Sequence, residues 1–343
     1  AGGAAPTTGP SRAAPPPGDR LDEFAANIRS GGPPKDGIPP IEEPAFVAAD
    51  EADFLVDDDV VFGIVHEGEV RAYPQLVLVW HEIVNDAFPD GPLSVTYCPL
   101  TGSTVGFRGT APGGEPFTFG TSGNLVNSNL LMYDRQTDSQ WPQILATAID
   151  GPARGTELVE VPLDWTTWGS WRQRHPRTQV LSTDTGAIRD YGRDPYGSYR
   201  PLGGYYEPDS GLFFPVMHED DRLPPKEVVI GVKRRDARLA VRKETVRDES
   251  VVATRLGDDS VVVVHDPAHD EGRAFLGRHS GKDVRLSPTG DGATYRDEAT
   301  GTVFDAAGEP LSGSGTRPLE RLVSYDVMWF AWLAFFPDSE VVL

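Results

Sequence analysis

The sequence predicts a mainly β protein with a few short helices (α+β), built from two divergent internal repeats that pack about a pseudo-two-fold axis. Three observations support this prediction. Short apolar runs alternate with polar residues and are separated by turns of Gly, Pro and Asp. A Trp-x-x-Trp segment occurs twice in the chain. Several other stretches match one another at a constant offset, which is how a duplicated unit appears in a sequence.

The expected elements follow in chain order. Residues 61–74 have the alternation and the glycine turn of a β-hairpin. A helix is expected over residues 74–87, because Pro74 suits a first helical position and the apolar residues recur at helical spacing. Further short strands are expected at residues 93–98, 103–109, 117–123, 130–135 and 157–161. The two Trp-x-x-Trp segments, which begin at Trp168 and Trp329, are expected to be short helices that anchor each repeat in its core.

The internal matches define the domain organisation. Residues 61–74 align with residues 229–242, and residues 93–107 align with residues 261–275, so that Pro99 falls on Pro267. The matches divide the chain into four parts, which are a Pro/Gly/Ala-rich tether and lead-in (1–54), a first repeat (55–183), a loop-rich connector (184–224) and a second, degenerate repeat (225–343). Clefts often form where two such units meet.

The composition excludes some classes of function. The formal net charge is −21, with 52 acidic and 31 basic residues, and such a surface repels nucleic acid. The excess of acidic residues over lysine suits a protein from a high-salt cell, and a GC-rich coding sequence is the other explanation for arginine replacing lysine. A single cysteine excludes an intramolecular disulfide.

The N-terminal residues bear on location. No run of about 18 apolar residues is present, so a membrane contact is expected only through an N-terminal anchor. Residues 1–19 lack the features of a signal peptide and are typical of a tether that follows a removed signal or a lipid-anchored cysteine. We therefore expect an extracellular or cell-surface anchored protein. A lipid anchor and self-association at the cell surface are part of this expectation.

Ordered motifs occupy residues 80–86, 97–103, 119–143, 151–162 and 224–232. Together these motifs resemble the DUF3179 family, a set of uncharacterised bacterial and archaeal proteins. The positions that match the family pattern are His81, Cys98, Asp134, Arg135, Ser139, Trp141 and Lys226. Thr101 stands where many members carry a second cysteine, so a dithiol centre cannot form here. The resemblance implies export or membrane association and brings no assigned activity.

Cys98, in the stretch 95-VTYCPLTGS-103, leaves three alternatives open. It could be a nucleophile with His81 as its base, as in a thiol-dependent enzyme. It could be a metal ligand together with His81 and either His218 or His265, a ligand set that suits copper or another transition metal. It could also be a small buried thiol without chemistry.

A second cluster of polar residues occurs at residues 133–141. Asp134, Arg135, Ser139 and Trp141 suit a loop that binds a small polar ligand, and they suit a structural turn equally well. The remaining histidines, His66, His175, His269 and His279, are expected to be solvated.

The leading hypothesis is an extracytoplasmic metal-binding or redox-related protein with a Cys/His site between the repeats. The alternatives are a cell-surface binding or structural protein without catalysis, and an enzyme that uses Cys98 with His81. Whether the protein is an enzyme stays open at this point.

Overall fold

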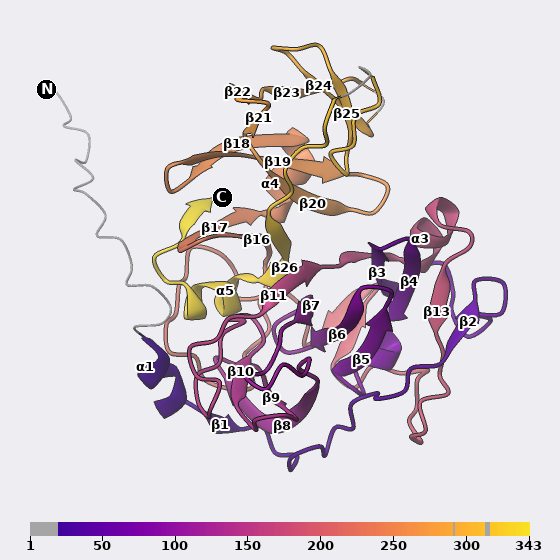
Figure 1. Ribbon diagram of the computed structural model, residues 1–343, viewed down its shortest axis with the longest axis vertical. Helices are drawn as coiled ribbons and strands as arrows, with labels where there is room; N and C mark the ends of the chain where they lie inside the picture. The colour runs from indigo at the N-terminus through magenta and orange to yellow at the C-terminus, as the bar shows by residue number, and fades with distance from the viewer. Residues whose placement is uncertain (1–19, 291, 313–315) are drawn as a thin grey trace, which may run out of the picture.

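A computed structural model describes residues 20–290, 292–312 and 316–343, and its described part is mainly β, as predicted (Figure 1). The helices are short and lie at the ends of strands. They are α1 (Leu21–Ala26), α2 (Gln75–Leu78), α3 (Trp168–Arg174), α4 (Lys243–Glu249) and α5 (Trp329–Phe335). None of these helices combines the length and the apolar character that crossing a bilayer requires.

The first half, residues 55–183, supplies four strands of a five-stranded sheet, and the lead-in supplies the fifth, β2. Its strands are β2 (Phe46–Ala48), β3 (Val60–His66), β4 (Glu69–Pro74), β12 (Asp164–Thr167) and β13 (Gln179–Leu181), in the order β12-β3-β4-β13-β2. The predicted hairpin is present, because β3 and β4 pair antiparallel around Glu67 and Gly68. Both turn residues have positive φ, at 48° and 81°, as a two-residue turn matched to the strand twist requires.

The second half, residues 225–343, contains a four-stranded sheet. Its strands are β16 (Val228–Arg234), β17 (Ala237–Arg242), β26 (Val323–Met328) and β27 (Glu340–Val342), in the order β26-β16-β17-β27. In both halves the strand after the C-terminal helix pairs parallel to the second strand of the hairpin. The relation of the two halves by a pseudo-two-fold axis stays a prediction.

Two further sheets complete the lower part of Figure 1. One is ordered β11-β7-β6-β5 and consists of β5 (Ile83–Phe88), β6 (Gly91–Cys98), β7 (Ser103–Arg108) and β11 (Val159–Pro162). The other is ordered β1-β8-β9-β10 and consists of β1 (Arg29–Ser30), β8 (Phe119–Val126), β9 (Asn129–Asp134) and β10 (Gln140–Pro142). The strands expected from the sequence in this region are thus confirmed.

The upper part of Figure 1 holds the remaining strands of the second half. One three-stranded sheet contains β18 (Val251–Leu256), β19 (Asp259–Asp266) and β20 (Glu271–Leu276), and another contains β23 (Leu286–Pro288), β24 (Thr294–Asp297) and β25 (Val303–Asp305). A short ribbon in this part pairs β21 (Arg278–His279) with β22 (Lys282–Asp283). Another short ribbon, in the connector, pairs β14 (Gly197–Tyr199) with β15 (Leu202–Gly204).

The predicted helix over residues 74–87 is wrong beyond its first turn. The helix α2 ends at Leu78, and residues 83–88 form β5, which pairs with β6. The competing signal is 90-Asp-Gly-91, a tight-turn dipeptide between two apolar runs. The helical spacing of the apolar residues was therefore incidental, since a short apolar run fits either period.

Each Trp-x-x-Trp segment forms the short helix that was predicted, and its second indole packs on a glycine. Trp171 covers Gly63 of β3, and Trp332 covers Gly231 of β16. A methyl group added at either glycine would overlap the indole ring. Both indoles are buried, at 1% and 0% exposed. The strand glycines are therefore required by close packing of an aromatic ring.

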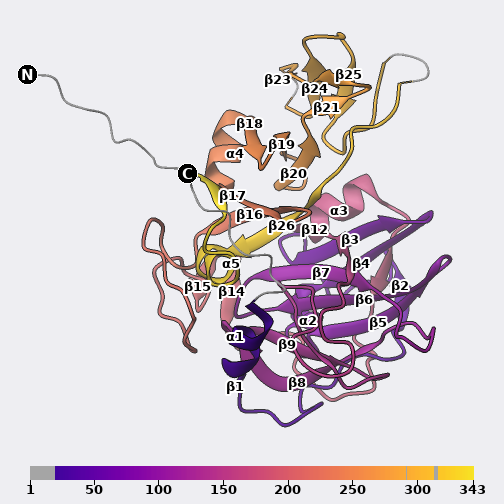
Figure 2. The ribbon, with the colours of Figure 1, turned by 60° about the vertical axis from the view of Figure 1, so that its left-hand side comes forward.

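The lead-in before the first half belongs to the folded body from residue 20 onwards. Phe24 is fully buried and contacts the ring of Phe335 in α5, at 5.4 Å between centroids. The strands β1 and β2 pair with β8 and β13. The tether expected over residues 1–19 lies outside the described residues. The largest apolar cluster joins side chains of the first half, such as Trp141, to Trp332 of α5, so the two halves share a core. Figure 2 shows α5 beside the strands of the first half.

Candidate functional site

Cys98 ends β6 and is buried, with 1% of its surface exposed. Its Sγ accepts the backbone N–H of Leu130 at 3.3 Å, and its thiol faces the carbonyl of Ser128 at 3.9 Å. Burial raises the pKa of the thiol to about 11, and the charge of Glu82 adds to this rise. Cys98 is therefore a protonated thiol at neutral pH, which is unsuited to nucleophilic attack without a change in its surroundings.

A network of buried polar side chains holds the turn after Cys98. Thr101 bonds Ser103 at 2.9 Å and accepts from Asn129 at 3.0 Å. Gln143 accepts from both Ser103, at 2.7 Å, and Asn129, at 3.0 Å. All four side chains are fully buried. A buried network whose members are satisfied fixes one conformation of the chain, so the turn is rigid.

His81 is hydrogen-bonded to two segments that are distant from it in the sequence, the lead-in and the connector. Its Nδ1 bonds the carbonyl of Pro39 at 2.7 Å, and its Nε2 bonds the hydroxyl of Tyr191 at 2.6 Å. Burial lowers the pKa of the ring, which is therefore neutral at pH 7. Because both nitrogens are used, His81 has no lone pair or proton directed at Cys98. It links the lead-in to the connector.

The four predicted metal ligands do not come together in this structure. His265 bonds Asp270 at 3.1 Å in the second half, and His218 is exposed on the connector. Within the described ranges, the one group of three His, Cys, Asp or Glu side chains with ligand atoms within 4.8 Å is His66, Glu67 and Asp90. A metal site at Cys98 and His81 stays an untested prediction.

The group at His66 is occupied by a cation of the protein itself. Arg108 pairs with both carboxylate oxygens of Asp90, one of them at 2.5 Å, while His66 contacts Asp90 at 2.9 Å. Since the guanidinium already neutralises the carboxylate, the arrangement is explained as an ion-paired surface cluster.

The loop after β9 is a buried turn around Asp134. The carboxylate of Asp134 accepts the backbone N–H of Thr137 at 2.5 Å, the backbone N–H of Ser139 at 3.1 Å and the indole N–H of Trp141 at 2.9 Å. Asp134, Ser139 and Trp141 are each 0% exposed. These contacts account for the polar residues of the turn as structural groups, and ligand binding at this loop stays a prediction.

Arg135 points outward from the same loop. It donates to Glu42 at 2.9 Å and to the hydroxyl of Tyr133 at 2.6 Å, and it lies 3.3 Å from Asp36. The side chain thus ties the loop to the lead-in.

Glu82 is the residue in this region that the sequence reasoning did not single out. It lies between α2 and β5 with φ at 59°, a left-handed conformation that costs a non-glycine residue about 1 kcal/mol or more. Its backbone is held by bonds to Leu78 and Tyr97. The carboxyl is 9% exposed and makes no hydrogen bond or ion pair with any described residue. Burial raises its pKa to about 8.

The Glu82 side chain lines a cavity of about 250 Å³ beneath the connector. Apolar and aromatic side chains form most of the wall, and no Lys, Arg or His is among them. The lining residues are Gly31, Pro33, Ile38, Glu82, Leu100, Thr121, Gly123, Asn124, Leu125, Leu130, Tyr196, Phe213 and Phe214. We refer to this space as the Glu82 cavity.

The connector that covers the Glu82 cavity is fastened at several points. Tyr205 donates to the carbonyl of Leu100 at 2.9 Å. Lys226, which is 1% exposed, donates to the carbonyls of Tyr205 and Gly211 at 2.6 and 2.8 Å. Burial lowers the pKa of this lysine to about 8. The aromatic wall of the cavity is therefore a fixed part of the fold.

Comparison with known families agrees with the motifs. A family model described as a protein of unknown function, DUF3179, matches residues 35–339, nearly the whole chain. The chain belongs to the DUF3179 family. No curated protein and no solved structure matched it.

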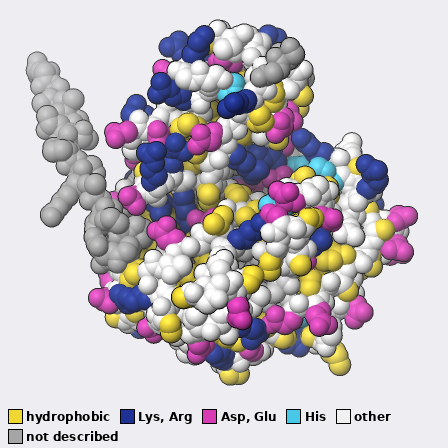
Figure 3. Space-filling view, in the orientation of Figure 1, with side chains coloured by type: hydrophobic (Ala, Val, Ile, Leu, Met, Phe, Trp, Pro, Cys, Tyr) yellow, Lys and Arg dark blue, Asp and Glu magenta, His cyan; other side chains and the backbone are white. Residues whose placement is uncertain are grey.

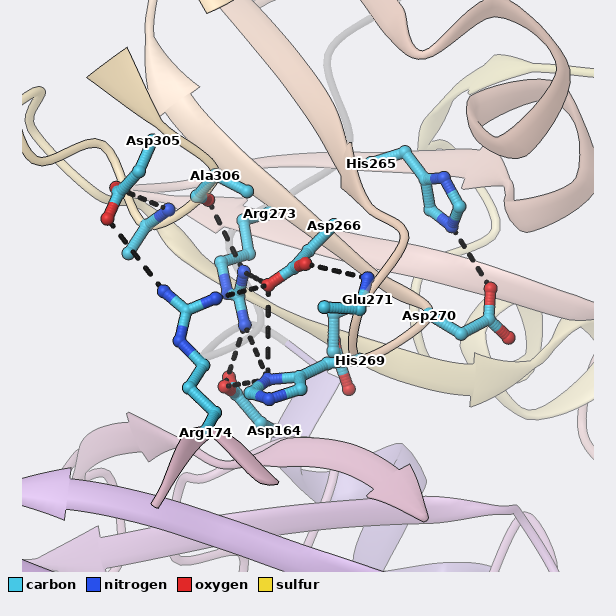
Figure 4. Close-up of polar contacts among 12 residues, drawn as sticks. Asp164, Arg174, His265, Asp266, His269, Asp270, Glu271, Arg273, Asp305 and Ala306 are labelled. Atoms are coloured by element: carbon cyan, nitrogen blue, oxygen red, sulfur yellow. Dashed lines mark hydrogen bonds and ion pairs between the residues drawn. The ribbon is translucent and has the colours of Figure 1, made fainter. Parts of the chain in front are cut away.

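The DUF3179 protein also has a polar layer where its halves meet. Arg273 of the second half donates to Asp266 at 2.5 Å and to Asp164 of the first half at 2.7 Å (Figure 4). His269 Nδ1 lies 3.3 Å from Asp164. Figure 3 shows basic and histidine side chains gathered in the hollow between the upper and lower parts. The expectation that His269 is solvated is wrong, because it is 2% exposed.

Two features of this DUF3179 protein could be found only in part from the sequence. Glu82 was not singled out, because the predicted helix over residues 74–87 placed it within a helix and not at the start of a strand. The 90-Asp-Gly-91 turn was the signal that could have moved it to the start of a strand. His269 follows a strand in the second half, and nothing in its local pattern indicates that Asp164, more than a hundred residues earlier, covers it.

Proposed function

We propose that the protein binds a small organic cation, an amine or a quaternary ammonium group with an apolar body, in the Glu82 cavity. The observation that carries this proposal is the carboxyl of Glu82, which is buried on the cavity wall without a partner in the described chain. Burying an ionisable group without compensation is costly, and an unpartnered one in a cavity is typical of a binding site.

The lining supports a cation over other ligands. With no Lys, Arg or His on the wall, an anion would meet only the carboxyl of Glu82 and would be repelled when that group ionises. The rings of Tyr196, Phe213 and Phe214 offer faces that attract ammonium groups. The volume of about 250 Å³ leaves room for an apolar body beside the charged group.

Binding of a cation would be linked to pH. With a pKa of about 8, Glu82 is mostly protonated at pH 7, and it must release its proton to pair with the ligand. The affinity therefore increases as the pH approaches 8 and levels off above it. The same linkage means that close to one proton is released for each ligand bound at neutral pH.

Titration calorimetry tests the proposal with butylammonium, tetramethylammonium and butyrate as probes. In two buffers of different ionisation enthalpy at pH 7, the cations should bind with release of a proton and butyrate should not bind. Glu82→Gln should abolish binding, whereas Glu43→Gln, which changes an exposed carboxylate, should leave it intact. Equal binding by wild type and Glu82→Gln would sink the idea.

We also propose that the two halves are copies of one unit related by a pseudo-two-fold axis. The matching strand orders and the two glycine–indole contacts support this relation. Cys98 and Asp266 occupy corresponding ends of β6 and β19, and both are 1% exposed. A superposition of β12-β3-β4-β13 on β26-β16-β17-β27 that placed Trp171 and Trp332 apart would contradict the duplication.

An extracellular or cell-surface location is likewise a proposal. It is supported by the small-residue, Pro-rich residues 1–19 and by the family resemblance. Fractionation of cells that produce the protein checks it, and recovery in the cytosolic fraction would contradict it.

A further inference from the structure

A second cavity lies between the two halves, since residues of both halves and of the connector line it. It has a volume of about 150 Å³. Its wall contains Thr166 of β12, Arg200 of the connector, and Lys243, His269 and Asp326 of the second half. A single water needs about 10–15 Å³ of such space, so there is room for a molecule of several non-hydrogen atoms. We refer to this space as the junction cavity.

Three buried polar atoms on this wall have no partner among the described residues. They are Oγ1 of Thr166, Nε2 of His269 and Oδ1 of Asp326. The three residues are 4%, 2% and 7% exposed, so bulk solvent does not satisfy these atoms. Native proteins rarely leave buried polar atoms unpaired, and three on one cavity indicate a shared bound partner.

The neighbouring charges of the junction cavity are of both signs. Lys243 pairs with Asp326, and Arg247 pairs with Asp270. Arg200 lies at the wall with an exposed side chain, and its guanidinium makes no hydrogen bond or ion pair with any described residue. The wall therefore offers a guanidinium and a carboxylate oxygen that no described residue pairs with.

The His269 ring contributes a directed group between these charges. Its Nδ1 faces Asp164 at 3.3 Å, which leaves Nε2 as the atom without a partner. Figure 4 shows the ring between Asp164 and the strands of the second half. A carboxylate held by Arg200 could also accept from Thr166, and an ammonium group could donate to Asp326.

We propose that the junction cavity binds a small zwitterion of the α-amino acid class. Its carboxylate contacts Arg200 and Thr166. Its ammonium group donates to Oδ1 of Asp326 and to Nε2 of His269, which accepts when Nδ1 donates to Asp164. A simple anion would leave Oδ1 of Asp326 unpaired, and a simple cation would leave Arg200 unpaired. A metal ion is disfavoured by Lys243 and Arg247 on the same wall. This site is separate from the Glu82 cavity and does not depend on the function proposed there.

Titration calorimetry with glycine, alanine, acetate and methylammonium tests the proposal. Glycine or alanine should bind at least about tenfold more tightly than acetate or methylammonium, because each single-charge probe loses one charged hydrogen bond. Arg200→Gln and Thr166→Val should each weaken glycine binding by about tenfold. Arg177→Gln, which changes an exposed arginine away from the cavity, and Glu82→Gln should leave it unchanged.

Three results would overturn the proposal. The first is no binding of glycine or alanine at millimolar concentration, which would assign the junction cavity to water alone. The second is binding of acetate as tight as that of glycine, which would make the site a simple anion site. The third is unchanged glycine binding in both Arg200→Gln and Thr166→Val, with each variant shown to be folded by its unfolding transition.

Discussion

The pH dependence of stability isolates the contribution of Glu82, and the variant Glu82→Gln is the perturbation. In the folded protein, burial raises the pKa of Glu82 to about 8, against a usual value of 4.5. The folded state therefore binds more protons than the unfolded state between these two values. The contribution of Glu82 to the free energy of unfolding is therefore largest below pH 4.5 and is lost as the pH rises to about 8.

The size of the effect follows from the two pKa values. At about 1.4 kcal/mol for each pKa unit, the difference corresponds to about 5 kcal/mol as an upper limit. Glutamine is close in shape to the protonated carboxyl and does not ionise. The variant and the wild type should therefore have free energies of unfolding within about 1 kcal/mol at pH 5. At pH 9 the variant should be more stable by about 3–5 kcal/mol.

Urea unfolding of both proteins at several pH values between 5 and 9 provides the measurement. Other buried acids, such as Glu271, also contribute to the pH dependence of each protein. The difference between wild type and variant cancels these contributions. Glu43→Gln serves as the matched control, and its curve should run parallel to that of the wild type. A difference that stays flat across the range would show that Glu82 is not buried as an isolated acid, and the reasoning for the Glu82 cavity would fail.

Three further predictions concern other parts of the fold. Gly63→Ala and Gly231→Ala should each reduce the free energy of unfolding by about 3 kcal/mol, since the new methyl group overlaps a buried indole. The control Gly113→Ala, at an open position, should change it little, and an unchanged urea midpoint for Gly63→Ala would contradict the packing. Cys98 should resist alkylation at pH 8 in the folded protein and react fully in denaturant, because a pKa of about 11 leaves only about a thousandth of the Cys98 side chains as thiolate. Rapid labelling of the folded protein, detected by mass spectrometry, would contradict the burial of Cys98. Lys226→Met should reduce the free energy of unfolding by about 3 kcal/mol, because it leaves the carbonyl groups of Tyr205 and Gly211 without their hydrogen-bond donor. An unchanged midpoint of urea unfolding would show that other contacts hold the connector in place.

The elements that the sequence predicts well are those with local signals. The hairpin around Glu67 and Gly68 has both an alternating pattern and a turn that needs positive φ. The helices at Trp168 and Trp329 are short, and their indole spacing sets which side faces the sheet. For these elements, the residues that decide the structure lie within a few positions of one another.

The site residues are decided by contacts that are distant in the sequence, and this is why they were harder to predict. His81 is paired with Pro39 and Tyr191, which lie 42 and 110 residues away. No local pattern indicates that both of its nitrogens are used. The unpartnered state of Glu82 likewise depends on the connector that covers it. The sequence singles out His81 of the motif at residues 80–86, whereas Glu82 beside it is the group that has no partner among the described residues.

The pairing of β3 with β12 has a consequence for the synthesis of the protein. In β3, Gly63 is paired with Asp164, the first residue of β12, which is about a hundred residues later in the chain. The strand β16 is likewise paired with a much later strand, β26. At about 5–20 residues per second, a ribosome needs several seconds to about 20 seconds to deliver each missing partner. During that interval a nearly apolar strand edge is open to other nascent chains. The chain is therefore most exposed to aggregation while it is being translated, and a chaperone that shields β3 and β16 would act in those seconds.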